Sequence, residues 1–567
     1  MNATHDPEAS ENHSSAEVDV LVVGAGITGI YQLYRARECG FSVLLLETGR
    51  GVGGTWFWNR YPGARFDSES YTYGYLFSRE LFEEWEWQEH FAPQPETERY
   101  LNHVVDRFDL RRHIRFGARV TSAEYEERSG AWRVRAADGS ESRARFVIAA
   151  TGVLSVPYTP EVPGVEDFRG EMHHTGLWPA EPVDFYGKRV AIIGTSSSGV
   201  QVVPAIIDQV ASLTIYQRTA NWCTPLNNAP ITAEEQTRLR LDFEELRETL
   251  NTSVHGFHHS PHDRAAFEDS EDERQRFYEA MWNSPGFTKL TSNYSDLLSN
   301  PEANAEWCAF IAGKIRAIVD DPETAERLIP KNQRFGEKRP PFIAGYYEAF
   351  NRENVSLVDL RETPISRITA TGIETTEGKQ DFDLIVWATG FDFGTGALAR
   401  MGIQGRGRLR LTDYWADGPR TFLGVQAHGF PNLFFPGGPH AAAGNNPRYN
   451  GDQVDFIIDL LVHARAHGYD VIEVTERSEE RWTNMVNRGA DSPLSFGESS
   501  YYFGTNIPGK PRRYLLNSGG RPKLFSVIAD VVANDYDAFS LSQVSASTEA
   551  SESTEASEAT EAAGATS

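Results

Sequence analysis

Residues 18–29 read Val18-Asp-Val-Leu-Val-Val23-Gly24-Ala-Gly26-Ile-Thr-Gly29, an apolar strand that runs into three glycines at G-x-G-x-x-G spacing. Apolar residues at helical spacing follow to about Cys39, and a second strand at residues 41–46 leads to the acid Glu47. The glycines permit a tight turn and let a pyrophosphate approach the backbone at the positive N-terminus of the helix. Glu47 can accept hydrogen bonds from both ribose hydroxyls of an adenosine. The run predicts a Rossmann-like domain, and its N-terminal position and following acid indicate that Gly24, Gly26, Gly29 and Glu47 bind FAD.

A second strand, loop and helix follow at residues 189–209, with the loop Gly194-Thr195-Ser196-Ser197-Ser198-Gly199. Ser196 replaces the middle glycine of the pattern. Its Cβ would crowd a pyrophosphate unless the backbone shifts, but its hydroxyl could donate a hydrogen bond to phosphate. The G-x-S-x-G elbow of an esterase is excluded because Ser198 stands where the last glycine is needed.

The residues after the next strand, at 213–217, indicate which nucleotide this second loop binds. The strand ends in Gln217-Arg218-Thr219 and not in an acid. An acid would repel a 2′-phosphate, whereas a guanidinium and a hydroxyl can bind one, so NADPH is preferred to NADH. Lys338 is a second candidate phosphate contact. The alternative is that Arg218 is an ordinary exposed arginine after a strand.

Two further strand-like runs, at residues 146–150 and 384–388, both lead into Ala-Thr-Gly. Such paired endings resemble the crossover strands of flavoproteins with two dinucleotide domains. We therefore expect an α/β fold with two discontinuous Rossmann-like domains, one for FAD and one for NADPH, and a helical insertion in the latter. The expected bounds are 18–152 and 385–544 for FAD, 153–231 and 329–384 for NADPH, 232–328 for the insertion, and disordered ends at 1–17 and 545–567.

Composition narrows the function classes. Acidic residues outnumber basic ones by 80 to 54 in 567 residues, which argues against nucleic acid or an anionic membrane as a partner. No apolar run approaches the roughly 18 residues of a membrane span, and no secretory signal is visible. The three cysteines, Cys39, Cys223 and Cys308, are too far apart for the redox pair of a flavin disulfide reductase. We expect a cytoplasmic protein, with a monomer favoured.

Two longer motifs point to one family. The first reads Gly53-Gly-Thr55-Trp56-Phe-Trp-Asn-Arg-Tyr61-Pro-Gly63-Ala-Arg65-Phe-Asp67, and the second Phe168-Arg-Gly170-Glu-Met-His-His174-Thr-Gly-Leu-Trp178-Pro179. They resemble the two signatures of the Baeyer–Villiger monooxygenases, and the resemblance covers roughly residues 17–540. It is closest to the branch of phenylacetone, steroid and cyclopentadecanone monooxygenases. It implies that NADPH reduces FAD and that O2 then converts a ketone, bulky or cyclic, to an ester or lactone through a C4a-peroxyflavin and a Criegee-type adduct.

The same resemblance implies the site residues. The family's active-site arginine falls on Arg339, in Lys338-Arg339-Pro340, and Asp67 is the partner that orients it. A fixed guanidinium can stabilise the anions of this reaction, although the pair could instead be a structural salt bridge. His174 is expected in an interdomain linker with a structural role. Residues 437–447 are expected to roof the flavin. The remaining implied cofactor contacts are Thr55, Trp56, Arg65, Asp67, Tyr73, Val120, Gln201 and Tyr501, the last standing where relatives usually carry Trp.

The main competing interpretation is a flavin monooxygenase that oxidises nitrogen or sulfur. Trp178-Pro179 argues against it, because that sister group usually ends its motif in another aromatic residue without this proline. An NADPH oxidase would need the same two nucleotide loops, and so would a nucleotide-binding module without enzymatic activity.

Overall fold

The computed structural model describes residues 16–441, 444–489 and 500–544. Within these ranges the larger sheet has the order β15-β4-β5-β6-β1-β2-β3, and β16 also pairs with β6. Its strands are β1 (Ala16–Val23), β2 (Val43–Leu46), β3 (Ile114–Arg115), β4 (Val120–Glu126), β5 (Ala131–Ala136), β6 (Glu141–Ala149), β15 (Ile403–Gln404) and β16 (Leu433–Phe434). β1 lies between β2 and β6 in parallel, and Val20, Leu21 and Val22 are fully buried. A continuous apolar run is what a strand covered on both faces requires.

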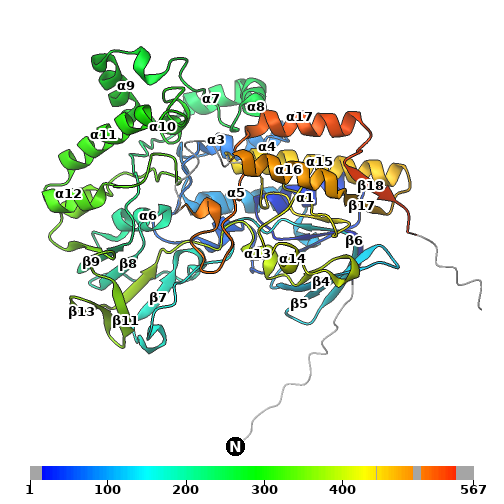
Figure 1. The fold of residues 1–567 in the computed structure, drawn as a ribbon, viewed down its shortest axis with the longest axis horizontal. Helices are drawn as coiled ribbons and strands as arrows, with labels where there is room; N and C mark the ends of the chain where they lie inside the picture. The colour runs from blue at the N-terminus through cyan, green and yellow to red at the C-terminus, as the bar shows by residue number, and fades with distance from the viewer. Residues whose placement is uncertain (1–15, 442–443, 490–499, 545–567) are drawn as a thin grey trace, which may run out of the picture.

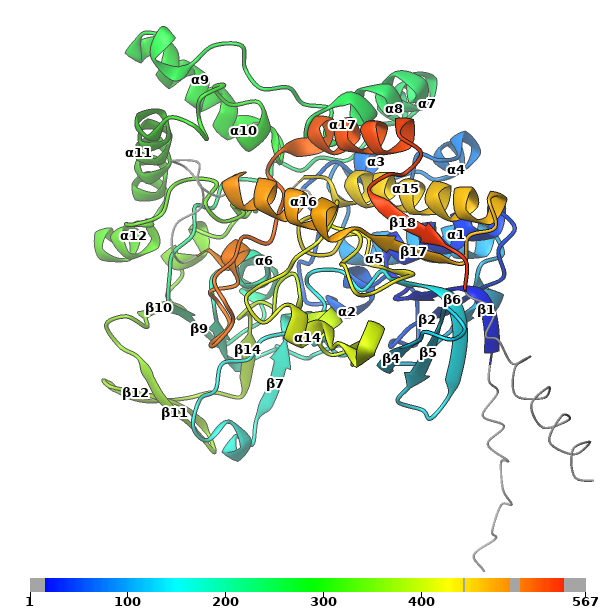
Figure 2. The same ribbon diagram turned by 45° about the vertical axis from the view of Figure 1, so that its right-hand side comes forward.

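Helix α1 (Ile27–Glu38) follows the first glycine loop, as the sequence predicts. It packs against α15 (Asn446–Ala466), and residues such as Ile30, Leu33, Ile457 and Leu461 belong to one buried cluster. α15 lies in a layer with α16 (Glu476–Gly489) and α17 (Gly520–Ala533) on one side of the larger sheet (Figures 1 and 2). The C-terminal part of the chain therefore completes the domain that its N-terminal part begins.

The second sheet contains only parallel pairs, in the order β10-β9-β8-β14-β7. Its strands are β7 (Glu171–His174), β8 (Arg189–Ile193), β9 (Ser212–Gln217), β10 (Val355–Asp359) and β14 (Leu384–Trp387). Helix α6 (Ser197–Ile206) follows the second glycine loop and ends three residues before the expected end. The structure thus has the predicted pair of α/β units, although the larger sheet also contains the antiparallel pairs β4–β5 and β5–β6.

The two Ala-Thr-Gly runs lie directly beneath the two glycine loops. A Cβ on Gly24 would meet the Ala150 oxygen at 2.7 Å, and a Cβ on Gly194 would meet the Ala388 oxygen at 2.4 Å. Both glycines have positive φ, +103° and +110°, a region that other residues rarely adopt. Each loop therefore requires glycine at its first position for two reasons. The backbone there has a positive φ, and the strand that leaves or re-enters the domain lies too close for a side chain.

Residues 232–328 fold as helices, as their apolar spacing predicts. They form α7 (Ala233–Leu241), α8 (Phe243–Thr252), α9 (Glu271–Asn283), α10 (Thr288–Thr291), α11 (Pro301–Ile318) and α12 (Pro322–Leu328). Helices α9, α11 and α12 lie at the opposite end of the molecule from β4 and β5 (Figures 1 and 2).

The remaining helices and strands complete the described fold. Two antiparallel sheets were not anticipated, β11 (Ile365–Thr369) with β12 (Gly372–Thr375) and β13 (Gly378–Asp381), and β17 (Val471–Val474) with β18 (Phe539–Ser542). The other helices are α2 (Thr55–Trp58), α3 (Ser70–Tyr73), α4 (Arg79–Glu84), α5 (Gln94–Arg107), α13 (Gly396–Ala399) and α14 (Leu411–Tyr414).

β1 begins at Ala16, two residues before the expected start of the FAD domain, and the acidic tail lies outside the described residues. Within the described ranges no helix is long and apolar enough to cross a membrane.

Candidate active site

A cavity of about 440 Å³ brings most of the sequence-predicted site residues together. Thr55, Trp56, Arg65, Asp67 and Tyr73 line it from the segment that follows β2. The other predicted residues on its wall are Gly194, Thr195, Ser196, Ser197, Ser198, Gln201, Arg218, Thr219, Lys338, Arg339 and Tyr501. The wall is therefore shared by the two dinucleotide-binding units.

Arg339 and Asp67, which are 272 residues apart, form a bidentate ion pair on this wall. Arg339 Nε donates to Asp67 Oδ2 at 3.3 Å, and Nη2 donates to Oδ1. The Asp67 side chain is 9 % exposed, whereas that of Arg339 is 38 % exposed. Burial alone would lower the pKa of Arg339, but the Asp67 carboxylate outweighs that effect and raises it. The guanidinium is thus permanently charged and held in one orientation, with Nη1 carrying two further donors.

Aromatic rings fix both partners of the ion pair. The Arg339 guanidinium lies 4.7 Å from the centre of the Phe287 ring, a cation–π contact. Next to Asp67, the Phe66 ring stacks on Tyr73 at 4.6 Å, and Trp56 Nε1 donates to the Tyr73 hydroxyl at 2.8 Å. Residues 55–73 thereby form a packed unit that presents one carboxylate to Arg339.

The centre of the first signature attaches this unit to helix α6. The Tyr61 hydroxyl donates to Gln201 Oε1 at 2.7 Å, and Gln201 Nε2 donates to the Arg65 oxygen at 3.1 Å. Gly63 has a φ of +81°, and a Cβ there would lie 2.5 Å from the Gln201 oxygen. The tyrosine and glycine of this motif therefore serve the contact between the two units.

The first glycine loop and Glu47 lie away from the cavity wall, with the geometry that an FAD nucleotide needs. A Cβ on Gly29 would overlap the Gly24 oxygen at 1.8 Å, so the helix can begin this close to the strand only with glycine. No side chain caps the N-terminus of α1, which leaves its N–H groups for a phosphate. Glu47 is 5 % exposed and accepts from the N–H groups of Ala25 and Gly49, both at 2.6 Å. Burial raises its pKa, against the lowering effect of these donors.

Val120, the remaining predicted flavin contact, is buried at the start of β4, where it pairs with Ala136. It lies in the core of the larger sheet and not on the cavity wall.

At the second loop, Ser196 occupies the N-cap position of α6 with φ −88° and ψ −174°, ordinary extended angles. The backbone therefore does not require glycine there. The Ser196 side chain does not cap the helix, so its hydroxyl remains for a phosphate. Thr195 Oγ1 donates to the Thr219 oxygen at 2.9 Å, which holds the loop against the end of β9.

Beside the second loop, a pocket of about 460 Å³ collects positive charge. Arg218 and Lys338 line both this pocket and the main cavity, and Lys331 and Arg361 line this pocket too. Burial lowers the pKa of Lys338, and the neighbouring charge of Arg218 lowers it further. Cations that crowd together in this way fit a phosphate group. The sequence did not reveal Lys331 and Arg361, because neither belongs to a local motif.

Tyr501 is also on the cavity wall, and its ring lies 5.4 Å from that of Phe393 and 4.5 Å from that of Tyr502. The stretch 437–447, expected to roof the flavin, contributes Gly444, Asn445 and Asn446 to the wall. Ala442 and Ala443 lie outside the described residues.

His174 has both ring nitrogens in contact with backbone groups. Nδ1 accepts from the Gly176 N–H at 2.9 Å, and Nε2 lies 3.3 Å from the Tyr158 oxygen. Burial lowers its pKa, so the ring is neutral. Trp178, four residues later, is 7 % exposed and packs in the same cluster as Tyr61. This geometry agrees with a structural role for the second signature, but His174 does not lie in a linker: it ends β7, where it pairs with Trp387 of β14 in the second sheet.

Comparison with known proteins places these features in a family. Residues 21–275 match the family model described as pyridine nucleotide-disulphide oxidoreductase, although all three cysteines here are free thiols. A 2-oxo-Δ3-4,5,5-trimethylcyclopentenylacetyl-CoA monooxygenase of Pseudomonas putida is 41 % identical over 546 residues, covering 94 % of this chain and 100 % of that protein. A Baeyer–Villiger monooxygenase of Pseudooceanicola batsensis is 36 % identical, covering 92 % and 96 %.

Two further relatives bear on cofactors and reaction type. A phenazine N-monooxygenase of Lysobacter antibioticus is 38 % identical, covering 95 % of this chain and 100 % of that protein. The crystal structure of OTEMO in complex with FAD and NADP superposes with a TM-score of 0.90 at 41 % identity, covering 93 % of this chain and 100 % of that one. With its paired glycine loops, its two signatures and its Arg339–Asp67 pair, the chain belongs to the Baeyer–Villiger monooxygenase family.

Proposed function

We propose that this protein is an NADPH- and O2-dependent flavin monooxygenase that converts ketones to esters or lactones. The balanced reaction is ketone + NADPH + O2 + H+ → ester or lactone + NADP+ + water. The observation that carries the proposal is the Arg339–Asp67 ion pair on the wall of a cavity shared by the two dinucleotide-binding units. The ketone monooxygenases among its relatives support this reading.

The residues at each loop fit the two cofactors. FAD would be held by the first loop, Glu47, and residues 55–73, and NADPH by the second loop, Arg218 and Lys338. When bound, the pair supplies two reducing equivalents and the activation of O2. We assign residues 18–152 and 385–544 to the FAD unit, 153–231 and 329–384 to the NADPH unit, and 232–328 to a helical insertion. One boundary needs a correction, because β14 (Leu384–Trp387) pairs with β7 and β8 and so extends the NADPH unit to Trp387.

Arg339 stabilises the negative charge that develops on the carbonyl oxygen when a ketone is attacked. Because Asp67 occupies Nε and Nη2, the donors of Nη1 remain for this oxygen. The orientation is set before the substrate binds, so no reorganisation is needed when the charge forms. Loss of one such donor typically costs on the order of 10²–10³ in rate.

The cavity wall also carries aromatic rings. Phe66, Phe257, Phe287, Phe391 and Phe393 line it, and they can exclude water from a reacting carbonyl. Such rings suit a ketone with a bulky or cyclic hydrocarbon body. We therefore propose bulky or cyclic ketones as the substrate class.

Arg339→Ala tests the proposal. The purified variant should retain the yellow colour of FAD and be bleached by NADPH without oxygen at nearly the wild-type rate. It should form lactone from cyclohexanone or a macrocyclic ketone on the order of 10²–10³ times more slowly. Arg316→Ala, which removes a surface ion pair with Glu326, is the matched control and should behave as wild type. Lactone formation at the wild-type rate by Arg339→Ala would refute the assigned role.

A second candidate function is the oxidation of a nitrogen centre, which the phenazine N-monooxygenase relative favours. Incubation with a cyclic ketone and an aromatic N-heterocycle, followed by product identification, separates the two. A lactone supports the first function, and an N-oxide without lactone supports the second. We also propose that the protein acts as a cytoplasmic monomer, which light scattering of the holoenzyme and fractionation of the source cells can test.

A further inference from the structure

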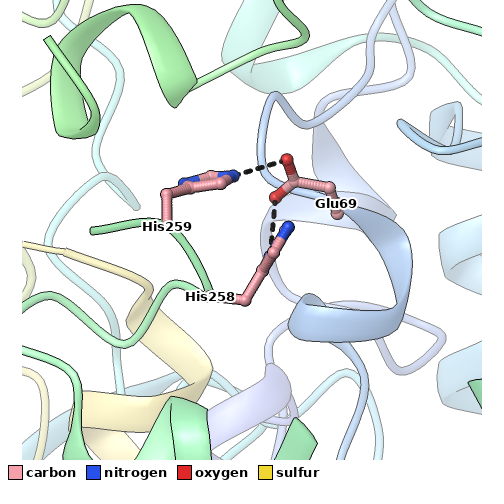
Figure 3. A group of neighbouring side chains, drawn as sticks. All are labelled: Glu69, His258 and His259. Carbon is pink, nitrogen blue, oxygen red and sulfur yellow. Dashed lines mark hydrogen bonds and ion pairs between the residues drawn. The ribbon is translucent and has the colours of Figure 1, made fainter. Parts of the chain in front are cut away.

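Outside the proposed active site, three potential metal ligands gather where α3 meets the loop after α8. They are Glu69, His258 and His259, and one ligand atom from each lies within 4.8 Å of the others. Figure 3 shows both imidazoles directed toward the Glu69 carboxylate. His259 Nε2 lies 2.8 Å from Oε1, and His258 Nδ1 lies 3.8 Å from Oε2.

Hydrogen-bonding distances fix His259 at both ring nitrogens. Its Nδ1 lies 3.0 Å from Thr291 Oγ1, and that hydroxyl lies 2.9 Å from the Phe287 oxygen. Its Nε2 lies 2.8 Å from Glu69 Oε1. Thr291 therefore holds the ring from the side opposite Glu69, with Nε2 directed at the carboxylate.

The other half of the cluster lacks hydrogen bonds. Glu69 is 2 % exposed, yet its Oε2 has no hydrogen-bond partner among the described residues. The same is true of His258 Nδ1, which faces it. Buried polar atoms normally have a partner, so a pair of them facing each other points to a third group between them.

We propose that Glu69, His258 and His259 form a binding site for a divalent transition-metal cation of the Zn²⁺ class. Two imidazoles and one carboxylate are a common ligand set for Zn²⁺. Bonds of about 2.0–2.1 Å in a tetrahedron place ligand atoms roughly 3.3 Å apart. The three ligand atoms here lie within 4.8 Å of one another, so a small movement of the side chains would bring them to one cation. Thr291 is the partner that orients a metal-bound histidine from its other nitrogen.

The exposure of the three side chains leaves a route for the cation. Glu69 and His259 are 3 % and 6 % exposed, while His258 is 33 % exposed and forms the rim. A water molecule can complete the tetrahedron from this side. The site lies close to the proposed active site, because the Phe257 ring lines the cavity and stacks on His259 at 5.8 Å. A bound cation would therefore fasten the segment that carries Phe257 to the segment that carries Asp67.

The test uses untagged, FAD-loaded protein that has been stripped with a chelator and titrated calorimetrically with Zn²⁺. We expect one equivalent to bind tightly and to raise the melting temperature. His258→Gln removes a ligand but leaves the His259–Glu69 contact intact, so it should fold and bind Zn²⁺ at least about tenfold more weakly. Glu69→Gln should lose binding altogether.

His103→Gln is the matched control. His103 lies 3.7 Å from Glu84, and the described residues place no third metal ligand beside this pair. The variant should bind Zn²⁺ as wild type does. Wild-type protein that binds no Zn²⁺, or a His258→Gln variant that binds it with unchanged affinity, would overturn the proposal. Flavin absorbance and circular dichroism before titration show that each variant is folded.

Discussion

Arg218→Ala should separate the two nicotinamide cofactors. In the structure Arg218 lies beside Lys338, and Arg361 Nε donates to the Arg218 oxygen at 2.8 Å. The substitution removes one of the four cations that line this pocket. It leaves the backbone in place, because Thr195 still holds the neighbouring Thr219 oxygen. The expected effect is therefore confined to the charge of the pocket.

The expected loss of NADPH affinity follows from the free energy of one hydrogen bond to a charged group. A hydrogen bond to a charged group contributes about 1.5–3 kcal/mol, and each 1.4 kcal/mol is a factor of ten in affinity. Loss of the Arg218 contact should weaken NADPH binding roughly 10- to 150-fold. The lower end is favoured because Lys338, Lys331 and Arg361 remain near the phosphate. NADH has no 2′-phosphate, so its affinity should change by less than about threefold.

Anaerobic stopped-flow reduction measures both cofactors in one assay. The bleaching of the flavin is recorded against the concentration of NADPH and of NADH, which gives a dissociation constant and a limiting rate for each. The limiting rates should be unchanged, and the NADPH affinity of the wild type should fall with salt more steeply than that of the variant. Arg367→Ala, an exposed arginine of β11, is the control. If both cofactors weaken equally, Arg218 does not bind the 2′-phosphate.

Two further predictions concern stability. Gly63→Ala should destabilise the protein by about 2 kcal/mol or more, because a left-handed backbone and a 2.5 Å approach to the Gln201 oxygen act together. Gly117→Ala, with a similar φ of +70° but no neighbour within 4 Å, should cost only the backbone part in the same urea titration. His440 is 1 % exposed, and burial lowers its pKa from 6.5 to about 4. Its contribution to stability is therefore complete above pH 6.5 and falls by up to about 3 kcal/mol as the pH drops toward 4. His440→Asn should flatten that part of a plot of the urea midpoint against pH. An unchanged plot would show that His440 is not the group responsible for the loss of stability.

Local patterns were enough to predict the parts of the fold that depend on local geometry. Each glycine loop needs a strand before it and a helix after it, and both are present at residues 16–38 and 189–206. The Ala-Thr-Gly runs were predictive for a related reason, since only a small residue fits under each loop. The sequence does not predict the antiparallel sheet of β11 to β13. All four residues of β13, Gly378–Asp381, are exposed, and apolar and polar residues do not alternate along the strand.

Contacts between distant residues could not be predicted in the same way. No pattern near Arg339 points to Asp67, so only the family resemblance linked them. Lys331 and Arg361 reach the Arg218 pocket from loops that carry no recognisable motif. Glu69 and the His258-His259 pair belong to no motif in the sequence, and only the packing of α3 against the loop after α8 brings them together.

The first signature joins two functions that are usually considered separately. Asp67 orients the proposed catalytic arginine, while Tyr61, Gly63 and the Arg65 oxygen bind helix α6, whose N-terminus carries the proposed NADPH loop. Only one residue separates Arg65 from Asp67, so displacement of α6 would also displace the carboxylate that holds Arg339. Any movement of the NADPH unit between reduction and oxygenation must either carry residues 61–67 with it or break these contacts together.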